Sequence, residues 1–172
     1  MSMEWFDVVN ERDEVVGRAP RAEVHARGLR HRAVHVLVFN GRGQLFLQKR
    51  SRWKDREPGL WDSSASGHVD AGEAYDAAAV RELREELGVE LAAPPQRWFK
   101  LEACPETDQE FVWVYRLEHG GPFQWSSEEI EDGAWFDPGV ISRWVRTEPA
   151  MFARSFRYLW AEVERRGGRA EP

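Results

Sequence analysis

The sequence predicts an α/β protein in which helices cover both faces of a β-sheet, an α/β/α sandwich. Segments with the alternating pattern of strands are interleaved with segments that have helical periodicity. Residues 33–39 are apolar on both faces, as expected of a central strand that is covered on two sides. The chain has 172 residues and no internal repeat or linker-like tract, which predicts a single domain over residues 1–172.

The amino-terminal part is predicted to form a hairpin, a short helix and two strands. The hairpin turns at the polar residues 10–13, and the helix has Pro20 in its first turn. These elements are expected at residues 5–16, 20–26, 33–39 and 44–48. A long loop follows over residues 51–72, and loops of this length are often functional.

The clearest helical pattern covers residues 74–87. An apolar stripe runs along this segment, and Gly88 supplies the stop signal. The stripe consists of Val80, Leu83 and Leu87. It is expected to dock the helix on the core.

The carboxyl-terminal part is predicted to add strands and a closing helix. Strands are expected at residues 97–103, 110–117 and 134–136. Thr147, Glu148 and Pro149 form a good helix start, and apolar side chains follow on one face as far as Val163. Arg165, Arg166 and Gly167 are typical of a helix end.

Composition excludes several classes of protein. With 24 basic and 30 acidic residues the net charge is −6, which argues against a nucleic-acid or membrane-surface binder. The single cysteine, Cys104, excludes an internal disulfide framework. No apolar run approaches the ~18–20 residues that span a bilayer, and there is no secretory signal pattern, so we expect a cytoplasmic protein.

Three carboxylates share one face of the helix at residues 74–87. At about 100° per residue, Glu82, Glu85 and Glu86 lie within one sector. Like charges at this spacing repel, and the helix dipole disfavours anions in the last turn. A divalent cation would reverse both effects, and oxygen ligands favour Mg²⁺ or Mn²⁺ over zinc. The alternative is a solvated acidic face.

The surroundings of the carboxylates favour the metal site. A glycine-containing loop enters the helix, with Glu73 at the entry and Arg81 inside. An ion pair between Glu73 and Arg81 would fix how the loop meets the helix. That pair would direct the backbone carbonyl of Gly67 toward the carboxylates.

These residues resemble the Nudix box. Gly67 is followed after five residues by Glu73 and after seven more by the run RELREELGV at residues 81–89, without a departure from the motif. The resemblance implies the Nudix α/β/α sandwich with a mixed β-sheet. It also implies cleavage of a diphosphate linked to another moiety, with Mg²⁺ or Mn²⁺ as cofactor.

Site residues carry over from the Nudix box position by position. The resemblance implies that Glu82, Glu85 and Glu86 are the catalytic, metal-binding carboxylates and that the Gly67 carbonyl is a further ligand. One carboxylate, with Glu82 favoured, would orient or deprotonate the attacking water. The same resemblance implies a structural pair of Glu73 with Arg81.

The resemblance extends beyond the box, over about residues 4–160. The segments at residues 7–10, 49–51, 58–61 and 66–68 are similar to the Nudix subgroup that includes isopentenyl-diphosphate isomerase. That isomerase has a cysteine directly before Gly-His and a degenerate box, whereas this chain has Ser66 and an intact box. Both departures favour a hydrolase on an isomerase-like frame.

Three histidines match the metal-binding histidines of the isomerase. They are His25, His31 and His68. Together with Glu110, and with Asp108 as a looser match, they could form a second metal site. Alternatively, a hydrolase of this subgroup could keep the histidines for packing or hydrogen bonding.

Candidate substrate contacts come from the loop after residue 48 and from a later acidic run. Arg50 and Lys54 match anion-binding positions of the isomerase-like pattern, whereas neighbouring basic residues are explained by solvation. Glu128, Glu129 or Glu131 could supply a further ligand or base, or form a solvated loop. Candidates for stacking on a base are Trp53, Trp61 and Trp125.

The leading hypothesis is a Mg²⁺-dependent hydrolase that cleaves the diphosphate linkage of a nucleotide. Its partner would be a small-molecule diphosphate, with no nucleic acid and no membrane, and no oligomeric state is predicted. Two alternatives stay open. One is an isomerase of prenyl diphosphates, and the other is a nucleotide-sensing Nudix module without turnover.

Overall fold

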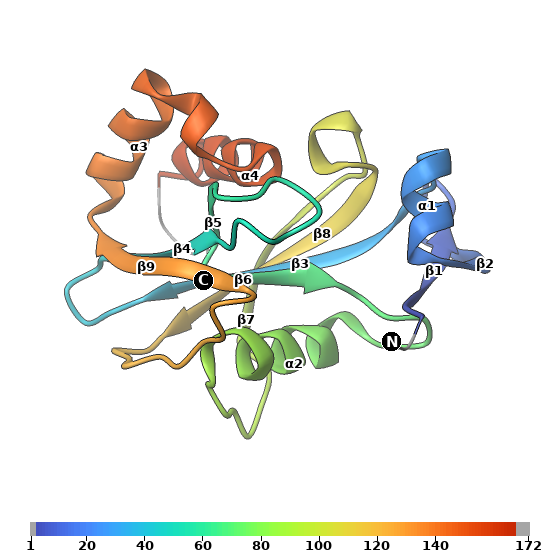
Figure 1. The fold of residues 1–172 in the computed structure, drawn as a ribbon, viewed down its shortest axis with the longest axis horizontal. Coiled ribbons are helices and arrows are strands. Elements are labelled where there is room, and N and C mark those ends of the chain that lie inside the picture. Colours follow the sequence, from blue (N-terminus) through green and yellow to red (C-terminus); the bar gives the residue numbers. More distant parts are fainter. Residues whose placement is uncertain (1–2, 168–172) are drawn as a thin grey trace.

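The computed structural model describes residues 3–167 and contains a mixed sheet between two layers of helices (Figure 1). Its strands follow the order β5–β4–β3–β8–β7, with β6 beside β3 and β9 beside β4. The strands are β3 (His31–Phe39), β4 (Leu45–Arg50), β5 (Trp61–Asp62), β6 (Ala65–His68), β7 (Gln96–Leu101), β8 (Glu110–Glu118) and β9 (Ile130–Phe136). Only the β3–β8 pair is parallel among these described strands. The α/β class and the mixed sheet are confirmed.

The central strand β3 is covered on both faces, as its apolar sequence predicts. Val34, Val36 and Val38 pack on one side with the helix α2 (Tyr75–Leu87). Leu37 and Phe39 pack on the other side with α3 (Pro138–Thr147) and α4 (Arg154–Arg165). Figure 1 shows α2 on one side of the sheet and the other two helices opposite. Alternation along one strand therefore supplies both cores.

The predicted hairpin and short helix form a separate unit at one end of the sheet. Strands β1 (Trp5–Val9) and β2 (Val15–Pro20) pair antiparallel, and α1 (Arg21–Arg27) follows directly. The hairpin turn is fastened to the main sheet by Asp13. Its carboxylate accepts hydrogen bonds from Arg32 Nε at 2.6 Å, Tyr75 Oη at 2.7 Å and Lys100 Nζ at 2.7 Å.

The segment at residues 51–72 contains two strands, so the prediction of a long structureless loop is wrong. β6 pairs with β3 in the register Val34↔Gly67, and β5 pairs with β4. β6 consists of small and polar residues, Ala-Ser-Gly-His, with no alternating pattern. Its strand conformation therefore comes from its partner β3 and not from its own propensity.

The prediction that a helix begins at Thr147 is also wrong, because α3 ends there and α4 begins at Arg154. Phe152 and Ala153 are extended and buried, and the Ala153 N–H donates to the Trp61 carbonyl at 2.9 Å. The predicted end is confirmed, since α4 stops at Arg165. Two short 3₁₀ turns complete the described elements, η1 (Pro105–Thr107) and η2 (Pro149–Met151).

The helix α2 has nearly the predicted bounds, but a different set of residues docks it. Leu83 and Leu87 are buried as expected, while Val80 is only half-buried and Ala78 and Ala79 take its place in the core. Gly88 ends the helix in the left-handed conformation, at φ 69°. None of the helices within residues 3–167 has the length and apolar character needed to cross a bilayer.

Candidate active site

The three carboxylates of α2 lie at one cleft, where the helix faces strand β6. The cleft has a volume of about 590 Å³, and its lining includes Glu82, Glu85, Glu86 and Gly67. The Glu86 side chain is buried, the Glu82 side chain is 12% exposed, and the Glu85 side chain is 54% exposed. The structure therefore brings the sequence-predicted carboxylates together, with two of them removed from bulk water.

Two hydrogen bonds hold the buried Glu86 carboxylate. Gln48 Nε2 on β4 donates to Oε2 at 2.9 Å, and the backbone N–H of Ser66 on β6 donates to Oε1 at 2.9 Å. Burial raises the pKa of Glu86 to about 7, and these two donors oppose that shift. Helix α2 is thus tied to two strands through one ionisable side chain.

Arg81 organises the entrance to the cleft. Its guanidinium binds both oxygens of Glu73, through Nε at 2.8 Å and Nη2 at 2.9 Å, and Nη2 also donates to the His68 carbonyl at 3.0 Å. The remaining nitrogen, Nη1, contacts Glu82 at 2.8 Å and Glu85 at 3.2 Å. One arginine therefore joins the loop, β6 and two of the carboxylates.

Gly67 is required by a close approach between β6 and α2. A Cβ atom at this position would overlap all three atoms of the Glu82 carboxylate. The backbone of Gly67 is not in the left-handed region, so the lack of a side chain, and not an unusual φ, is what the site uses. Glycine lets the carboxylate lie directly against the strand.

The donor set fits a divalent cation. Burial, followed by repulsion from Glu86, raises the pKa of Glu82 well above its usual value. Two neighbouring buried carboxylates are therefore costly as anions unless a cation neutralises them. The set consists of carboxylate oxygens with no thiolate or imidazole among them, which suits Mg²⁺ or Mn²⁺.

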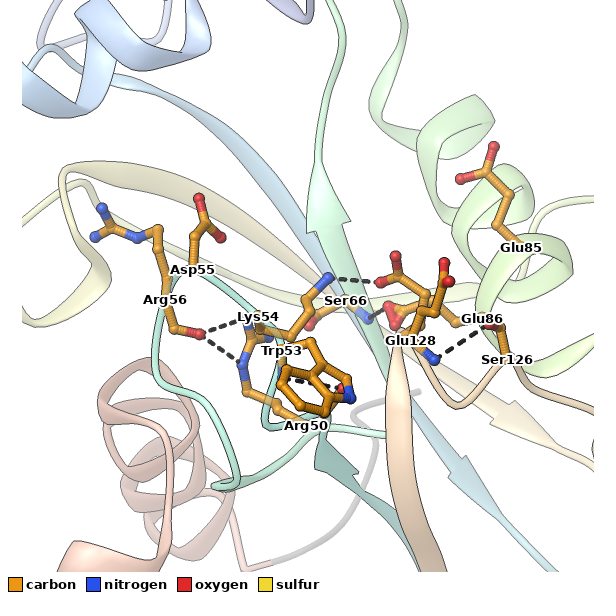
Figure 2. A network of polar contacts seen from close by, with 12 residues as sticks. Arg50, Trp53, Lys54, Asp55, Arg56, Ser66, Glu85, Glu86, Ser126 and Glu128 are labelled. Atoms are coloured by element: carbon orange, nitrogen blue, oxygen red, sulfur yellow. Dashed lines mark hydrogen bonds and ion pairs between the residues drawn. The ribbon is translucent and has the colours of Figure 1, made fainter. Parts of the chain in front are cut away.

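The predicted anion-binding residues Arg50 and Lys54 also line this cleft (Figure 2). Lys54 Nζ pairs with Glu129 Oε2 at 2.5 Å, which brings the later acidic loop to the cleft. The Arg50 guanidinium donates to the Arg56 backbone carbonyl at 3.0 Å and lies 3.4 Å from Asp62 Oδ2. Each cation is thus oriented by a partner.

Among the acidic-loop residues, Glu129 is the one that lines the cleft with the carboxylates. Glu131 is engaged elsewhere, by Arg52 and by Lys49 at 3.6 Å. The Glu128 side chain is exposed on the same loop (Figure 2). The structure therefore distinguishes three residues that the sequence left equivalent.

The predicted tryptophans differ in their availability. Trp61 is buried in the core against Phe136 and Trp144, so its interpretation as a stacking residue is wrong. Trp125 is half-buried against Phe46, and Trp53 is 77% exposed but does not line the carboxylate cleft. Trp5 of β1, which the sequence did not single out, lines the carboxylate cleft.

The three predicted histidines also meet, in a cluster under the β1–β2 hairpin. One ring nitrogen of each lies within 4.8 Å of the others. Glu110 Oε1 lies 3.4 Å from His31 Nε2 and 3.1 Å from His68 Nε2, while His25 Nδ1 lies 3.2 Å from Asp108. Phe6 stacks on His31 and His68, with ring centroids 5.7 and 4.5 Å apart.

The ionisable groups of the cluster shift one another's pKa. Burial alone would raise the pKa of Glu110, but hydrogen bonds from His31 and His68 lower it below its usual value. Burial lowers the pKa of His68, whereas hydrogen bonding and attraction to Glu110 outweigh burial and raise the pKa of His31. His25 Nε2 is buried and has no hydrogen-bond partner among the described residues.

Gln48 is the main contact of the site that sequence reasoning missed. It lies on the predicted second strand, where a polar side chain interrupts the apolar run Leu45 to Leu47 and is nevertheless buried. A polar residue at an inward strand position was the available signal, since buried amides need partners. The identity of its partner, Glu86, depends on tertiary packing.

Comparisons with known proteins identify a family and several relatives that this chain resembles. A family model described as the NUDIX domain matches residues 29–156. The chain is 36% identical to the uncharacterized Nudix hydrolase YfcD of Escherichia coli K12 over 146 residues, which is 82% of this chain and 78% of that protein.

Solved structures give the same answer for the fold. The crystal structure of DR0079 from Deinococcus radiodurans has a TM-score of 0.80 and 32% sequence identity, over 94% of this chain and 98% of that chain. The NUDIX domain of Shewanella oneidensis NrtR, solved with ADP ribose, has a TM-score of 0.59 at 17% identity, over 85% and 97% of the two chains. At 17% identity, the likeness to the NrtR domain concerns the fold alone.

Proposed function

The chain belongs to the NUDIX domain family and is a hydrolase of the Nudix pyrophosphohydrolase type, and from this premise we propose that it cleaves the diphosphate linkage of a nucleotide with Mg²⁺. One observation carries the proposal. Glu82, Glu85 and Glu86 converge on a cleft that also holds the cations Arg50 and Lys54. A diphosphate needs both a metal site and basic side chains, and this cleft offers the two together.

The nucleotide class is supported by fold-level likeness and by a half-exposed tryptophan at the cleft. The NUDIX domain of NrtR, which has the same fold, binds a nucleotide derivative. Trp5, 46% exposed, lines the carboxylate cleft and is placed to contact a planar group.

Residues 3–28 precede the family match and still contribute Trp5 and Phe6 to this cleft, so we propose that residues 1–172 act as one domain.

The residues of the cleft divide the chemistry among them. A bound divalent cation supplies charge neutralisation at the phosphoryl oxygens and at the leaving group. That cation would be held by Glu82, Glu85, Glu86 and the Gly67 carbonyl. Arg81 fixes Glu82 through Oε1, which leaves Oε2 to accept a proton from the attacking water. Arg50 and Lys54 bind the remaining phosphate oxygens.

We also propose that His25, His31, His68 and Glu110 form a second cation site. The convergence of three ring nitrogens within 4.8 Å, with a carboxylate beside two of them, supports it. Cobalt substitution tests it, because Co²⁺ bound by histidines gives visible absorption bands. A His25→Ala variant should lose those bands, whereas a colourless wild-type protein would leave the cluster as a hydrogen-bonded packing element.

A panel of nucleoside di- and triphosphates and nucleoside diphosphate sugars tests the main proposal. We expect release of phosphate or a nucleoside monophosphate with Mg²⁺, and with Mn²⁺ in place of Mg²⁺, but not with EDTA. A Glu86→Gln variant keeps one of the two acceptor oxygens that Gln48 and the Ser66 N–H use, and it should fold while losing at least about 100-fold in kcat/KM. No product from any compound would contradict the proposal.

Binding measurements with the same panel, and a separate assay with prenyl diphosphates, distinguish the two alternatives. Tight nucleotide binding without turnover would identify a sensing module. Interconversion of prenyl diphosphates would identify an isomerase. The isomerase is disfavoured by Ser66, whose hydroxyl replaces the thiol.

A further inference from the structure

A second cavity lies beside the carboxylate cleft, on the α4 side of β6. Its volume is about 560 Å³, and Ser66, Gly67 and His68 line both spaces. We call it the arginine chamber, because Arg154 and Arg157 of α4 face it together with Arg21, Arg50 and Arg56. A molecule bound at the carboxylates can therefore extend past β6 into this chamber.

The carboxylates of the arginine chamber already have partners. Each accepts a hydrogen bond or forms an ion pair with a neighbouring residue. Asp55 pairs with Arg21 at 3.1 Å, Asp62 with Arg50 at 3.4 Å, Asp108 with Arg56, Glu110 with His68 at 3.1 Å, and Glu57 with the backbone N–H of Arg154 at 2.8 Å. Four of these five carboxylates therefore have a basic side chain other than Arg154 and Arg157 as their partner, and Glu57 is bound by the Arg154 backbone and not by a guanidinium.

Two cations of the chamber are in the opposite situation. Neither the Arg154 nor the Arg157 guanidinium forms a hydrogen bond or an ion pair with any residue of the described stretch 3–167. The Nε atom of Arg157 is moreover buried without a partner. A buried donor without an acceptor is costly, so a ligand that supplies the acceptor gains binding energy at this point.

The lining also limits the kind of ligand. Among the described residues of the chamber, Ala33 is the largest aliphatic side chain and the only rings are His35 and His68. Such a surface offers no wall for a prenyl chain and little for stacking a base. Guanidinium groups instead match the geometry of phosphate and carboxylate oxygens.

Resting on the proposed function, we propose that the arginine chamber binds an anionic group of the substrate, a phosphate or carboxylate that lies outside the diphosphate being cleaved. Arg157 is its principal contact and Arg154 an accessory one. The preferred substrates are then nucleoside diphosphate derivatives that carry an additional negative charge on the moiety beyond the diphosphate.

Binding is tested first without turnover. In EDTA the three glutamates of α2 repel a polyanion, so calorimetry with inorganic pyrophosphate reports on the basic chamber. We expect Arg157→Gln to weaken pyrophosphate binding at least about tenfold. Arg143→Gln, on the exposed face of α3, removes the same charge away from the chamber and should bind as the wild type does. Absence of binding by the wild type, or equal binding by Arg157→Gln, overturns the inference.

Turnover then tests specificity with a matched substrate pair. A nucleoside diphosphate sugar and its uronic acid counterpart differ by one carboxylate. The ratio of their kcat/KM values should favour the acid and should fall at least about tenfold in Arg157→Gln, with no change in Arg143→Gln. An unchanged ratio with both compounds hydrolysed refutes the chamber and leaves the proposed function standing. If neither these compounds nor any member of the nucleotide panel is hydrolysed, the proposed function is refuted. The calorimetry then still decides whether the chamber binds anions.

Discussion

Replacing Gly67 by alanine tests the closest contact of the site. The added Cβ would overlap Oε1, Cδ and Oε2 of Glu82, so that carboxylate must move while the backbone of β6 accommodates alanine without strain. Opening the overlap to van der Waals distance needs a shift of about 1 Å or more. Such a shift also breaks the 2.8 Å contact between Glu82 and Arg81.

The expected loss follows from that displacement. A misplacement of about 1 Å at a catalytic group costs on the order of 100-fold in rate, so kcat should fall by about that factor. Overpacking of this kind destabilises by about 1–3 kcal/mol, which leaves a folded protein to assay. Urea unfolding followed by tryptophan fluorescence measures the second quantity.

A matched control separates steric overlap from a general effect of alanine. Gly41 lies in the turn between β3 and β4 with no atom within 4 Å of its virtual Cβ, and its φ is not positive. Gly41→Ala should leave both kcat and stability unchanged. It therefore reports any effect that is not specific to Gly67.

The cause is tested in a Glu82→Asp background, where the shorter side chain makes room for the new methyl group. If the overlap is responsible, Gly67→Ala costs much less there than in the wild type, a coupling that a double-mutant cycle measures. Wild-type turnover in Gly67→Ala, or an equal loss in both backgrounds, would refute the reasoning.

Two further substitutions probe the ion pairs around the site. Arg81→Lys cannot reproduce the two-pronged contact with Glu73, and steady-state kinetics should show kcat/KM lowered by about tenfold or more, with a wild-type value as the contradicting result. Asp13→Asn should lower the free energy of unfolding by about 1–3 kcal/mol at pH 7, since it weakens the carboxylate that binds Arg32, Tyr75 and Lys100. Burial raises the pKa of Asp13, but its hydrogen bonds bring the pKa below the usual value; the carboxylate therefore stabilises above about pH 4, and the difference between variant and wild type should shrink as the pH falls further. Urea unfolding at pH 7 and pH 3 checks this, and a difference that grows in acid would contradict it.

The parts of the fold that the sequence predicts are those with strong local signals. β3 has apolar residues on both faces, and α2 combines an apolar stripe with a glycine stop, so both were expected within two residues of their bounds. β6 has no such pattern, because hydrogen bonds to β3 determine its conformation. The helix α3 was missed although Asp137 and Pro138 are typical residues for a helix start, since Val140, Ile141 and Val145 are poor helix formers.

The candidate site divides in the same way. The spacing of Glu73, Arg81 and the three carboxylates along one helix and its entry loop is local, and the structure brings these residues together. The contact of Gln48 with Glu86 joins residues 38 positions apart, and no local pattern specifies it. The burial of Trp61 likewise depends on how the core packs, which is why the sequence could not exclude it as a stacking residue.

Titration with Mn²⁺, followed by electron paramagnetic resonance, tests the central claim most directly, because the signal of the free ion disappears on binding. The His25→Ala variant removes the histidine cluster as a competing site for the ion. We expect this variant still to bind Mn²⁺, and adding Glu86→Gln should weaken the binding at least about tenfold. Equal Mn²⁺ affinity with and without Glu86→Gln would contradict the assignment of the α2 carboxylates as the metal site.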